Sequence, residues 1–330
     1  MKPFYELSRN GRIGRLRKMA QSALAHYDLD VAELSILSTS FNTIFRVKTE
    51  DGGQYVLRIN YPNERTPIDI QSEMMWLDAL RRETDIPVAT PLHTKDGQLL
   101  VSITTDGIPE TRHCTMFHWI NGRTMKKPSL RTIHKIGAVM AQLHNHADTF
   151  KPSGEFCEIQ YNHAWTFGEP TRIYSSEKDS LFSPEQKAIV QDAIAKTQSY
   201  LDKLYQDKSG LRFLHADLHS WNVMLGEGKL HVIDFDDSMW CFPIQDIGIS
   251  LYYLEGGPLK DQIRPTFKSG YTQFRPWPES FDGEVDTIII QRTLDLMSLL
   301  VAEIENPEFE GELEHYLDVQ IPRLKEWVAK

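Results

Sequence analysis

Three short runs near the start of the chain alternate apolar with polar residues. They cover residues 34–37, 43–47 and 55–59 and are rich in β-branched and aromatic side chains. Such period-two alternation is typical of β-strands that bury one face. A turn of Asp, Gly and Gly at 51–53 favours a hairpin between the second and third runs. The pattern predicts three antiparallel strands, preceded by a helix that continues to about Tyr27.

The next segment changes to the spacing of an amphipathic helix over residues 67–83. Thr66 is a typical N-cap, and Pro67 stands at the first helical position, where its missing N–H leaves no bond unmade. Apolar residues then recur three or four positions apart, which predicts one buried stripe. The stripe consists of Ile70, Met74 and Leu77. We therefore expect one well-capped helix after the strands.

Glu73 lies on the same predicted face as this apolar stripe. A carboxylate directed toward a core needs a cationic partner, because an unpaired buried charge is costly. Arg58, on the third predicted strand, is the candidate partner. The alternative is that Glu73 lies at the edge of the stripe and reaches solvent.

Strand-like patterns give way to helical ones after the turn at Gly122. Two further strands are predicted before it, at 98–104 and 112–120. We therefore predict an N-terminal lobe over residues 1–119 and a C-terminal lobe over residues 120–330.

A long helix is predicted soon after this boundary, because apolar residues again recur at helical spacing. They are Ile133, Ile136, Met140 and Leu143. Gly137 and Ala141 lie beside them, and such small residues permit a neighbouring helix to pack closely.

A second hairpin pattern brings two polar residues together. Its strands are residues 223–225 and 230–233, joined by a turn with two glycines. Closing this hairpin places Asn222 and Asp234 at the open ends of neighbouring strands, which lie about 4.8 Å apart. An amide oxygen and a carboxylate are hard oxygen ligands, and these suit Mg²⁺ bound to substrate phosphates. The hairpin therefore predicts a magnesium site.

Asp217 precedes Asn222 by five residues and is expected at the tip of a loop. A carboxylate facing a transferred phosphoryl group is the base that accepts a hydroxyl proton. The flanking His215 and His219 form an H-x-D-x-H array, which is also the pattern of a hydrolytic metal site. That alternative leaves Asn222 and the hairpin unexplained.

These motif residues carry a resemblance to a known family. They are His215, Asp217, His219 and Asn222, followed by Asp234, Phe235 and Asp236. Over nearly the whole chain, the sequence resembles the aminoglycoside phosphotransferase and choline kinase group of kinase-like enzymes, which includes type II homoserine kinases. The resemblance implies an α+β, bilobal, protein-kinase-like fold, with a small antiparallel-sheet N-lobe and a larger, mostly helical C-lobe. It also implies that the γ-phosphoryl group of ATP is transferred to an alcohol.

The resemblance further implies roles on the catalytic side. Asp217 corresponds to the catalytic aspartate that orients the acceptor hydroxyl, and Asn222 and Asp234 correspond to the magnesium ligands. His215 resembles a histidine that braces the loop backbone. Asp246 resembles an aspartate that stabilises the same loop.

On the nucleotide side, Arg58 stands where many kinases have a lysine that contacts the α- and β-phosphates, with Glu73 as its helix partner. Arginine forks to phosphate oxygens and is always charged, so it suits this role. Residues 38–42 take the place of the phosphate-covering loop, with Ser40 and Asn42 as candidate contacts.

The resemblance also places adenine against the connection between the lobes. This connection contains Met116, Phe117, His118 and Trp119. Phe117 and Trp119 are equally compatible with an ordinary core position. Asp236 is predicted to contact either a second magnesium ion or the loop backbone.

Composition and charge reduce the number of protein classes to which the chain could belong. The chain is 41% hydrophobic and 25% charged, which is usual for a globular protein. No apolar run approaches the roughly 18 residues that span a bilayer, and the net charge of −10 argues against a nucleic-acid binder. The three cysteines lack the spacing of a disulfide framework or a zinc site, and a cytoplasmic location is expected.

The resemblance also implies that the acceptor binds in the helical lobe, which here means residues 149–185 and 286–318. Acidic and aromatic residues are mixed in this lobe. We predict a small hydroxylated acceptor, such as an amino alcohol, a homoserine-like compound, a sugar or an aminoglycoside. A Ser/Thr protein kinase is the second hypothesis. A nucleotide-binding regulatory module without turnover is the third, and the presence of Asp217, Asn222 and Asp234 disfavours it.

Overall fold

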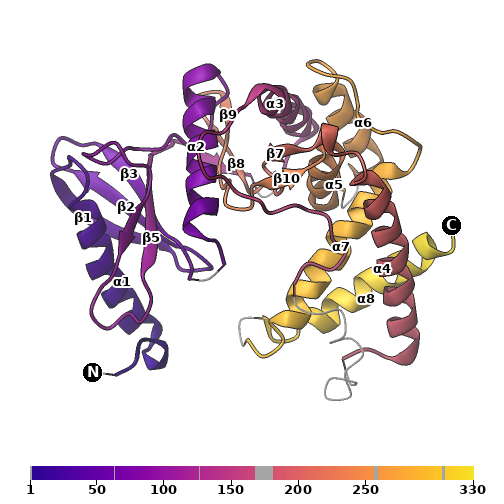
Figure 1. Cartoon of the computed structure of the whole chain (residues 1–330), viewed down its shortest axis with the longest axis horizontal. Helices are drawn as coiled ribbons and strands as arrows, with labels where there is room; N and C mark the ends of the chain where they lie inside the picture. Colours follow the sequence, from indigo (N-terminus) through magenta and orange to yellow (C-terminus); the bar gives the residue numbers. More distant parts are fainter. Residues whose placement is uncertain (1, 63, 126, 168–180, 256–258, 307–308) are drawn as a thin grey trace. The chain divides into compact units, whose positions relative to one another are not determined.

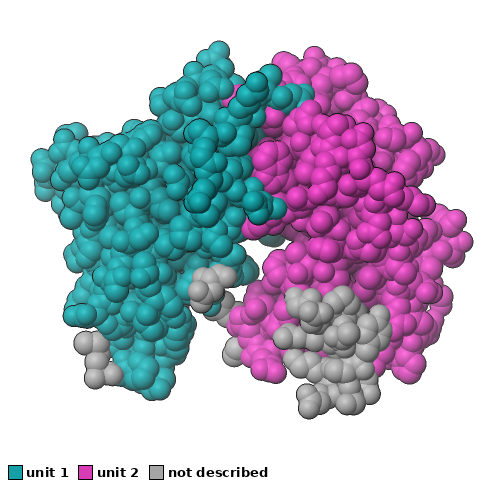
Figure 2. All heavy atoms as spheres, viewed as in Figure 1, with its two compact units in different colours: residues 1–126, 148–158, 221–236 teal, residues 127–147, 159–220, 237–330 magenta. Residues whose placement is uncertain are grey.

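In the computed structural model, the chain forms two compact units, each composed of three separate stretches of the sequence (Figure 2). The structure describes residues 2–62, 64–125, 127–167, 181–255, 259–306 and 309–330. Unit 1 contains residues 1–126, 148–158 and 221–236, and unit 2 contains residues 127–147, 159–220 and 237–330. Two parts of the predicted acceptor region, residues 168–180 and 307–308, lie outside the described residues.

Unit 1 is built on an antiparallel sheet with the strand order β1-β2-β3-β5-β4 (Figure 1). The strands are β1 (Val31–Ser38), β2 (Thr43–Thr49), β3 (Gln54–Ile59), β4 (Val101–Ile103) and β5 (Arg112–His118). The predicted hairpin is confirmed, because β2 and β3 pair from Thr43 with Ile59 to Lys48 with Gln54. The five strands predicted along this part of the sequence are therefore all present.

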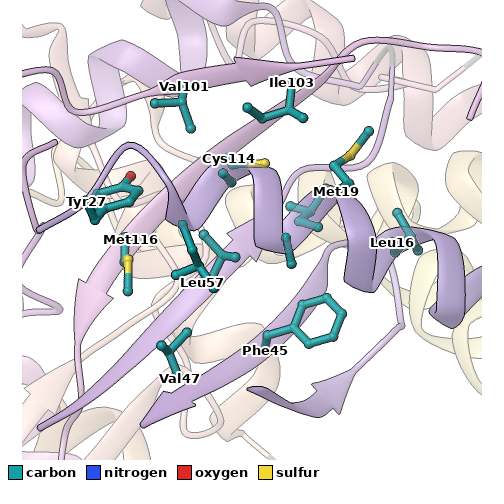
Figure 3. Packing of buried hydrophobic residues seen from close by; sticks show 14 of the residues in the cluster. Leu16, Met19, Tyr27, Phe45, Val47, Leu57, Val101, Ile103, Cys114 and Met116 are labelled. Atoms are coloured by element: carbon teal, nitrogen blue, oxygen red, sulfur yellow. The ribbon is translucent and has the colours of Figure 1, made fainter. Parts of the chain in front are cut away.

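Helix α1 (Arg9–Leu24) covers one face of this sheet and packs against β4. Its buried side chains meet those of the strands in one apolar cluster (Figure 3). Met19 of α1, Phe45 of β2, Leu57 of β3 and Cys114 of β5 are fully buried there. The alternation read from the sequence thus supplies the core of unit 1.

Helix α2 (Pro67–Glu83) begins where the sequence predicts. The Thr66 hydroxyl accepts a hydrogen bond from the Asp69 N–H at 3.2 Å, and the Asp69 carboxylate accepts one from the Thr66 N–H at 2.9 Å. This capping box satisfies donors that the first turn of a helix otherwise leaves unpaired. The predicted stripe is confirmed, since Ile70, Met74 and Leu77 are buried.

A second, three-stranded sheet of unit 1 contains the other predicted hairpin. Strands β8 (Val223–Gly226) and β9 (Lys229–Val232) pair around a two-residue turn, and β6 (Arg123–Thr124) adds to β8. The sheet also connects to the segment after α2, because the Ala89 N–H donates to the Val232 carbonyl at 3.0 Å.

Unit 2 is mostly helical. Its helices are α3 (Leu130–Thr149, whose last two residues belong to unit 1), α4 (Pro184–Leu204), α5 (Pro243–Leu254), α6 (Lys260–Tyr271), α7 (Glu284–Ala302) and α8 (Glu312–Val328). Its short strands β7 (Arg212–Leu214) and β10 (Met239–Cys241) pair with each other. Helix α7 packs against α4, α5 and α8, so its side chains reach several parts of the unit. Within the described part of the chain, no helix is long and apolar enough to cross a membrane.

Helices α3 and α6 approach each other closely at two glycines. A Cβ atom on Gly137 would overlap the Phe267 carbonyl oxygen, and one on Gly270 would overlap the His134 carbonyl oxygen. The role predicted for Gly137 in close helix packing is confirmed. Because main-chain oxygens cannot swing aside as a flexible side chain can, this crossing tolerates no larger residue without backbone movement.

We predict that Gly137→Ala lowers the free energy of unfolding by about 1–3 kcal/mol, the usual cost of overpacking. Gly14→Ala is the control, since Gly14 is an exposed helix position with open space around it. There the same change should raise stability slightly by removing glycine's backbone entropy. Urea denaturation followed by circular dichroism would compare the two variants. Equal stability of both would contradict the steric explanation.

Candidate active site

The hairpin β8–β9 places two predicted site residues at adjacent backbone positions in unit 1. Asn222 immediately precedes β8, and its carbonyl accepts a hydrogen bond from the Ile233 N–H at 3.0 Å. Asp234 follows Ile233 with a φ of 64°, so the chain turns sharply there. A left-handed aspartate is uncommon and costs conformational energy, which is frequent at functional positions. The predicted placement of both residues at neighbouring strand ends is confirmed.

Phe235 anchors the segment that follows this turn. Its ring is fully buried and packs edge-on against Trp76 of α2, with the ring centroids 5.3 Å apart. Aromatic pairs of this geometry add to the stabilisation from buried area. The motif of two aspartates is therefore fixed to the core of unit 1 by the phenylalanine between them.

Asp236 contacts two segments of unit 1 that lie far from it in the sequence, one at Asn42 and the other at Arg58 and Asn60. Its carboxylate accepts hydrogen bonds from Asn42 Nδ2 at 2.7 Å and from Asn60 Nδ2 at 3.4 Å. Arg58 Nη1 lies 3.6 Å from the same carboxylate. Asp236 thus contacts the predicted phosphate-covering loop through Asn42, while Ser40 in that loop is exposed and donates its N–H to the Ser38 hydroxyl at 3.3 Å.

Arg58 and Glu73 form a buried, two-pronged ion pair. Arg58 Nη1 and Nη2 donate to the two Glu73 oxygens at 2.9 and 2.5 Å, and only 4% and 3% of the two residues is exposed. The predicted partnership is confirmed, and the alternative in which Glu73 reaches solvent is wrong. The Arg58 guanidinium also donates to Thr115 at 3.2 Å and lies over the Phe117 ring.

Charge neutralisation governs this pair. Burial by itself disfavours the charged guanidinium, but the negative charges of Glu73 and Asp236 outweigh that effect and raise the pKa of Arg58 above its usual value. Arg58 therefore stays a cation inside unit 1, where bidentate bonds fix its orientation.

Backbone groups near the predicted adenine position are already paired within unit 1. The N–H groups of His118 and Trp119 donate to the carbonyls of Thr90 and Gln54, at 2.9 and 3.2 Å. Met116 is fully buried, and its carbonyl accepts a hydrogen bond at 2.8 Å from the segment after α2. An adenine contact by these residues stays a prediction.

In unit 2, Asp246 of α5 holds the loop that contains Asp217. Asp246 Oδ1 accepts a hydrogen bond from the Ala216 N–H at 2.9 Å, and Ala216 has a φ of 60°. Asp246 Oδ2 lies 2.9 Å from His144 Nε2, so a neighbouring helix supports it. The Asp217 N–H donates to His215 Nδ1 at 3.3 Å. His215 and Asp246 thus contact the loop backbone as predicted.

The Asp217 carboxylate is contacted on both oxygens. Arg292 Nη2 donates to Oδ1 at 2.7 Å, and His219 Nε2 lies 3.3 Å from Oδ2. Burial alone would raise the pKa of the Asp217 carboxyl, but the hydrogen bond from His219 and the charges of Arg292, His219 and His215 lower it below its usual value. Asp217 is therefore ionised at neutral pH.

Sequence reasoning missed Arg292 and Asp295, two residues of α7 that belong to the group of charged side chains around Asp217. Arg292 Nη1 donates to Asp295 Oδ2 at 2.7 Å, and Arg292 Nη2 donates to the Tyr253 hydroxyl at 2.8 Å. A signal was present, because the two opposite charges stand three residues apart in the mostly apolar stretch 288–301, which holds no other charged residue. Nothing in the local sequence links that stretch to Asp217.

The alternative of a hydrolytic metal site finds no support. In the parts of the chain that the structure describes, no group of three or more His, Cys, Asp or Glu residues is arranged to hold a metal ion. His215 Nδ1 instead accepts the Asp217 N–H, and His219 contacts the Asp217 side chain.

We predict that Glu73→Ala lowers the free energy of unfolding by about 3–5 kcal/mol, because it leaves the Arg58 cation buried without its bidentate partner. Urea denaturation would measure this loss. Glu33→Ala is the control, since Glu33 forms an exposed ion pair with Lys48 on the same sheet and should change stability little. A Glu73 variant as stable as the Glu33 variant would contradict the importance of the buried pair.

Comparison with known proteins extends these local findings. The sequence model of the phosphotransferase enzyme family matches residues 35–280. The serine/threonine protein kinase RdoA of Salmonella typhimurium is 22% identical over 281 residues, which cover 84% of this chain and 79% of that protein. A microcompartment-associated aminopropanol kinase has a similar structure, with a TM-score of 0.77, 21% identity and coverage of 95% of this chain and 98% of its own.

The structure of an amicoumacin kinase in complex with AMP-PNP, Ca²⁺ and Ami is also similar, with a TM-score of 0.75 and 19% identity. The match covers 95% of this chain and 96% of the amicoumacin kinase. These likenesses confirm the predicted α+β, kinase-like fold. The chain belongs to the phosphotransferase enzyme family and is a kinase with an alcohol group as phosphoryl acceptor.

Proposed function

We propose that this enzyme transfers the γ-phosphoryl group of ATP to a hydroxyl of a small amine-bearing molecule, with Asp217 as the base. The observation that carries the proposal is the environment of Asp217. An ionised carboxylate is held on a loop whose backbone is fixed by Asp246, and its own oxygens contact Arg292 and His219. A base must be ionised and oriented before it can accept a proton, and both conditions are met within unit 2.

In the proposed reaction, the acceptor oxygen attacks the γ-phosphorus while the bond from that phosphorus to the β–γ bridging oxygen breaks. The hydroxyl proton passes to Asp217, and ADP leaves. No covalent enzyme intermediate is required, so catalysis depends on positioning and on neutralising phosphate charge.

Asn222 and Asp234 are the residues that would hold Mg²⁺. They offer one amide oxygen and one carboxylate from adjacent backbone positions, a donor set that fits a cation preferring oxygen ligands. When bound, the ion would neutralise charge on the triphosphate. The hydrogen bond from Asn42 to Asp236 joins two side chains, so contact of Asp236 with a second magnesium ion and contact with the loop backbone both stay predictions.

On the nucleotide side, we assign the phosphate contact to Arg58. Its guanidinium is kept charged and oriented by Glu73 and Asp236. Asn42 also remains a candidate, because its loop is tied to the same carboxylate. Contacts of Ser40 with phosphate and of the 116–119 segment with adenine belong to this proposal as well.

An amine-bearing acceptor is favoured by the charge balance around Asp217. Two carboxylates, Asp217 and Asp295, share the single guanidinium of Arg292 in unit 2. Asp295 Oδ1 is buried, and among the described residues it has no hydrogen-bond partner. An ammonium or hydroxyl donor would satisfy this oxygen, and buried Tyr161 and half-buried Tyr253 provide aromatic surroundings for it.

Relatives are consistent with a small acceptor but also favour a second candidate. The two solved structures are described as kinases of aminopropanol and of amicoumacin. RdoA, by contrast, is described as a serine/threonine protein kinase. A protein hydroxyl is therefore the alternative acceptor.

We expect Asp217→Asn to lower kcat by about 10²–10⁴-fold, because the amide cannot accept the hydroxyl proton. Affinity for AMP-PNP, measured by calorimetry, should be nearly unchanged. Asp192→Asn, an exposed carboxylate on α4, is the control and should keep full activity. Near-normal turnover by the Asp217 variant would remove its assignment as the base.

A panel of acceptors would separate the two candidates. ADP release is measured with 1-amino-2-propanol, homoserine, sugars and aminoglycosides, and with each acceptor's N-acetylated form where it has an amine. We expect an amino alcohol to stimulate ADP release and its acetylated form to lose most of that effect. No stimulation by any small molecule, together with transfer of ³²P from ATP to protein serine or threonine, would favour the alternative.

A further inference from the structure

Arg292 is the most heavily engaged charged side chain near Asp217. It projects from α7, and 12% of its side chain is exposed. One guanidinium nitrogen, Nη2, donates both to Asp217 Oδ1 at 2.7 Å and to the Tyr253 hydroxyl at 2.8 Å. The other terminal nitrogen, Nη1, donates to Asp295 Oδ2 at 2.7 Å. A planar guanidinium held at two ends cannot rotate freely.

Asp295 provides the second attachment point. It lies one helical turn beyond Arg292 on the same face of α7, and its side chain is 3% exposed. The Tyr161 hydroxyl donates to Asp295 Oδ2 at 3.5 Å, which further restricts that carboxylate. The rigid helix, Asp295 and Arg292 therefore form a continuous support that ends at Asp217.

We propose that Arg292 is a positioning residue for phosphoryl transfer. It holds Asp217 Oδ1 so that Oδ2, which His219 contacts through one lone pair, presents its other lone pair to the acceptor hydroxyl, and Asp295 orients Arg292 for this purpose. The inference rests on the proposed function. Arg292 needs no contact with substrate in this role. It acts through the carboxylate that receives the proton.

The Arg292 guanidinium has two opposite effects on the rate expected for Asp217 as a base, one through base strength and one through geometry. Its charge lowers the proton affinity of Asp217, which weakens the base but keeps it ionised. Its hydrogen bond fixes the carboxylate, and misplacement of a reacting group by about 1 Å costs on the order of 10²-fold in rate. We infer that the gain in orientation outweighs the loss in base strength.

Several charged and titratable groups surround Asp217 and Arg292 in unit 2. Arg292, His219 and His215 act on Asp217, and Tyr161, Tyr253, Asp217 and Asp295 act on Arg292. Of these, Arg292 is a permanent cation in contact with the Asp217 carboxylate. Replacing it with a neutral residue should therefore raise the pKa of the Asp217 carboxyl.

The first test needs no acceptor. The pKa of Asp217 is measured by carbon-13 NMR of protein labelled at aspartate carboxyls, with the signal assigned by its absence in Asp217→Asn. Arg292→Met should raise this pKa by about one unit or more, since loss of a contacting opposite charge has effects of that size. Arg264→Met is the matched control, because Arg264 is likewise forked between two carboxylates, Glu255 and Asp286, and should leave the Asp217 pKa unchanged.

The second test separates orientation from charge. Arg292→Lys keeps the cation but loses the fork, so kcat should fall by about 10²-fold while KM for ATP stays the same. With Arg292→Met, the acidic limb of the kcat profile should also move to higher pH. Asp295→Asn should reproduce a smaller loss of kcat. If Arg292→Met does not fold, Arg292→Lys and Asp295→Asn carry the test.

The outcomes distinguish this inference from the proposed function. An unchanged Asp217 pKa in folded Arg292→Met, or full kcat in Arg292→Lys, would overturn the positioning role while leaving Asp217 as the base. Full turnover by Asp217→Asn would instead overturn the proposed base, and the positioning role with it.

Discussion

A buried arginine needs carboxylate partners to neutralise its charge, and this requirement determines key contacts in both units of the protein. Unpaired, such a cation costs several kcal/mol, which is a large part of the stability of a domain. In unit 1, Arg58 is neutralised by Glu73 and Asp236. In unit 2, Arg292 is neutralised by Asp217 and Asp295. Each arginine is thus paired with a motif aspartate, so the contacts that make burial possible also orient predicted site residues.

The backbone contributes the second part of this arrangement. Two residues of the predicted site segments adopt left-handed conformations: Ala216, which lies between His215 and Asp217, and the predicted magnesium ligand Asp234. Neighbouring contacts compensate for that strain, through the Asp246 hydrogen bond to Ala216 and through the buried Phe235 ring after Asp234. Rigid elements therefore fix the direction in which the chain leaves each turn. In this family such precision is useful, because positioning supplies most of the catalysis of phosphoryl transfer.

Local sequence rules predicted the features that depend on near neighbours. The Thr66 cap, the β8–β9 hairpin and the close approach at Gly137 follow from residue types and spacing within one or two elements. The Arg58–Glu73 pair was also predictable, because a carboxylate on a buried helix face requires a cation and few were available. Each of these inferences needed only residue type, periodicity or the cost of burying charge.

Contacts between distant segments were not predictable in the same way. Arg292 lies 75 residues after Asp217, and the hydrogen bond from Asn42 to Asp236 spans 194 residues. Periodicity identifies which face of an element is buried but not which element it packs against. The charged pair Arg292 and Asp295 on α7 indicated a polar contact inside the core, but the sequence did not indicate that Asp217 is its partner. The exchange of segments between the units, such as residues 221–236 with unit 1, has no local signature either.

The contacts around Asp217 indicate which chemical class of acceptor the enzyme would bind. Two carboxylates share the guanidinium of Arg292, and Asp295 Oδ1 has no hydrogen-bond partner in the part of the chain that the structure describes. Both features favour an acceptor with a hydrogen-bond donor or a positive charge. The most direct test is a phosphorus-31 NMR spectrum of the enzyme with ATP, Mg²⁺ and the amino alcohol that most stimulates ADP release. The proposed chemistry predicts a new phosphomonoester signal that grows in step with ADP. ADP accompanied only by inorganic phosphate would mean transfer to water, and would contradict the proposed transfer to the hydroxyl of a small amine-bearing molecule.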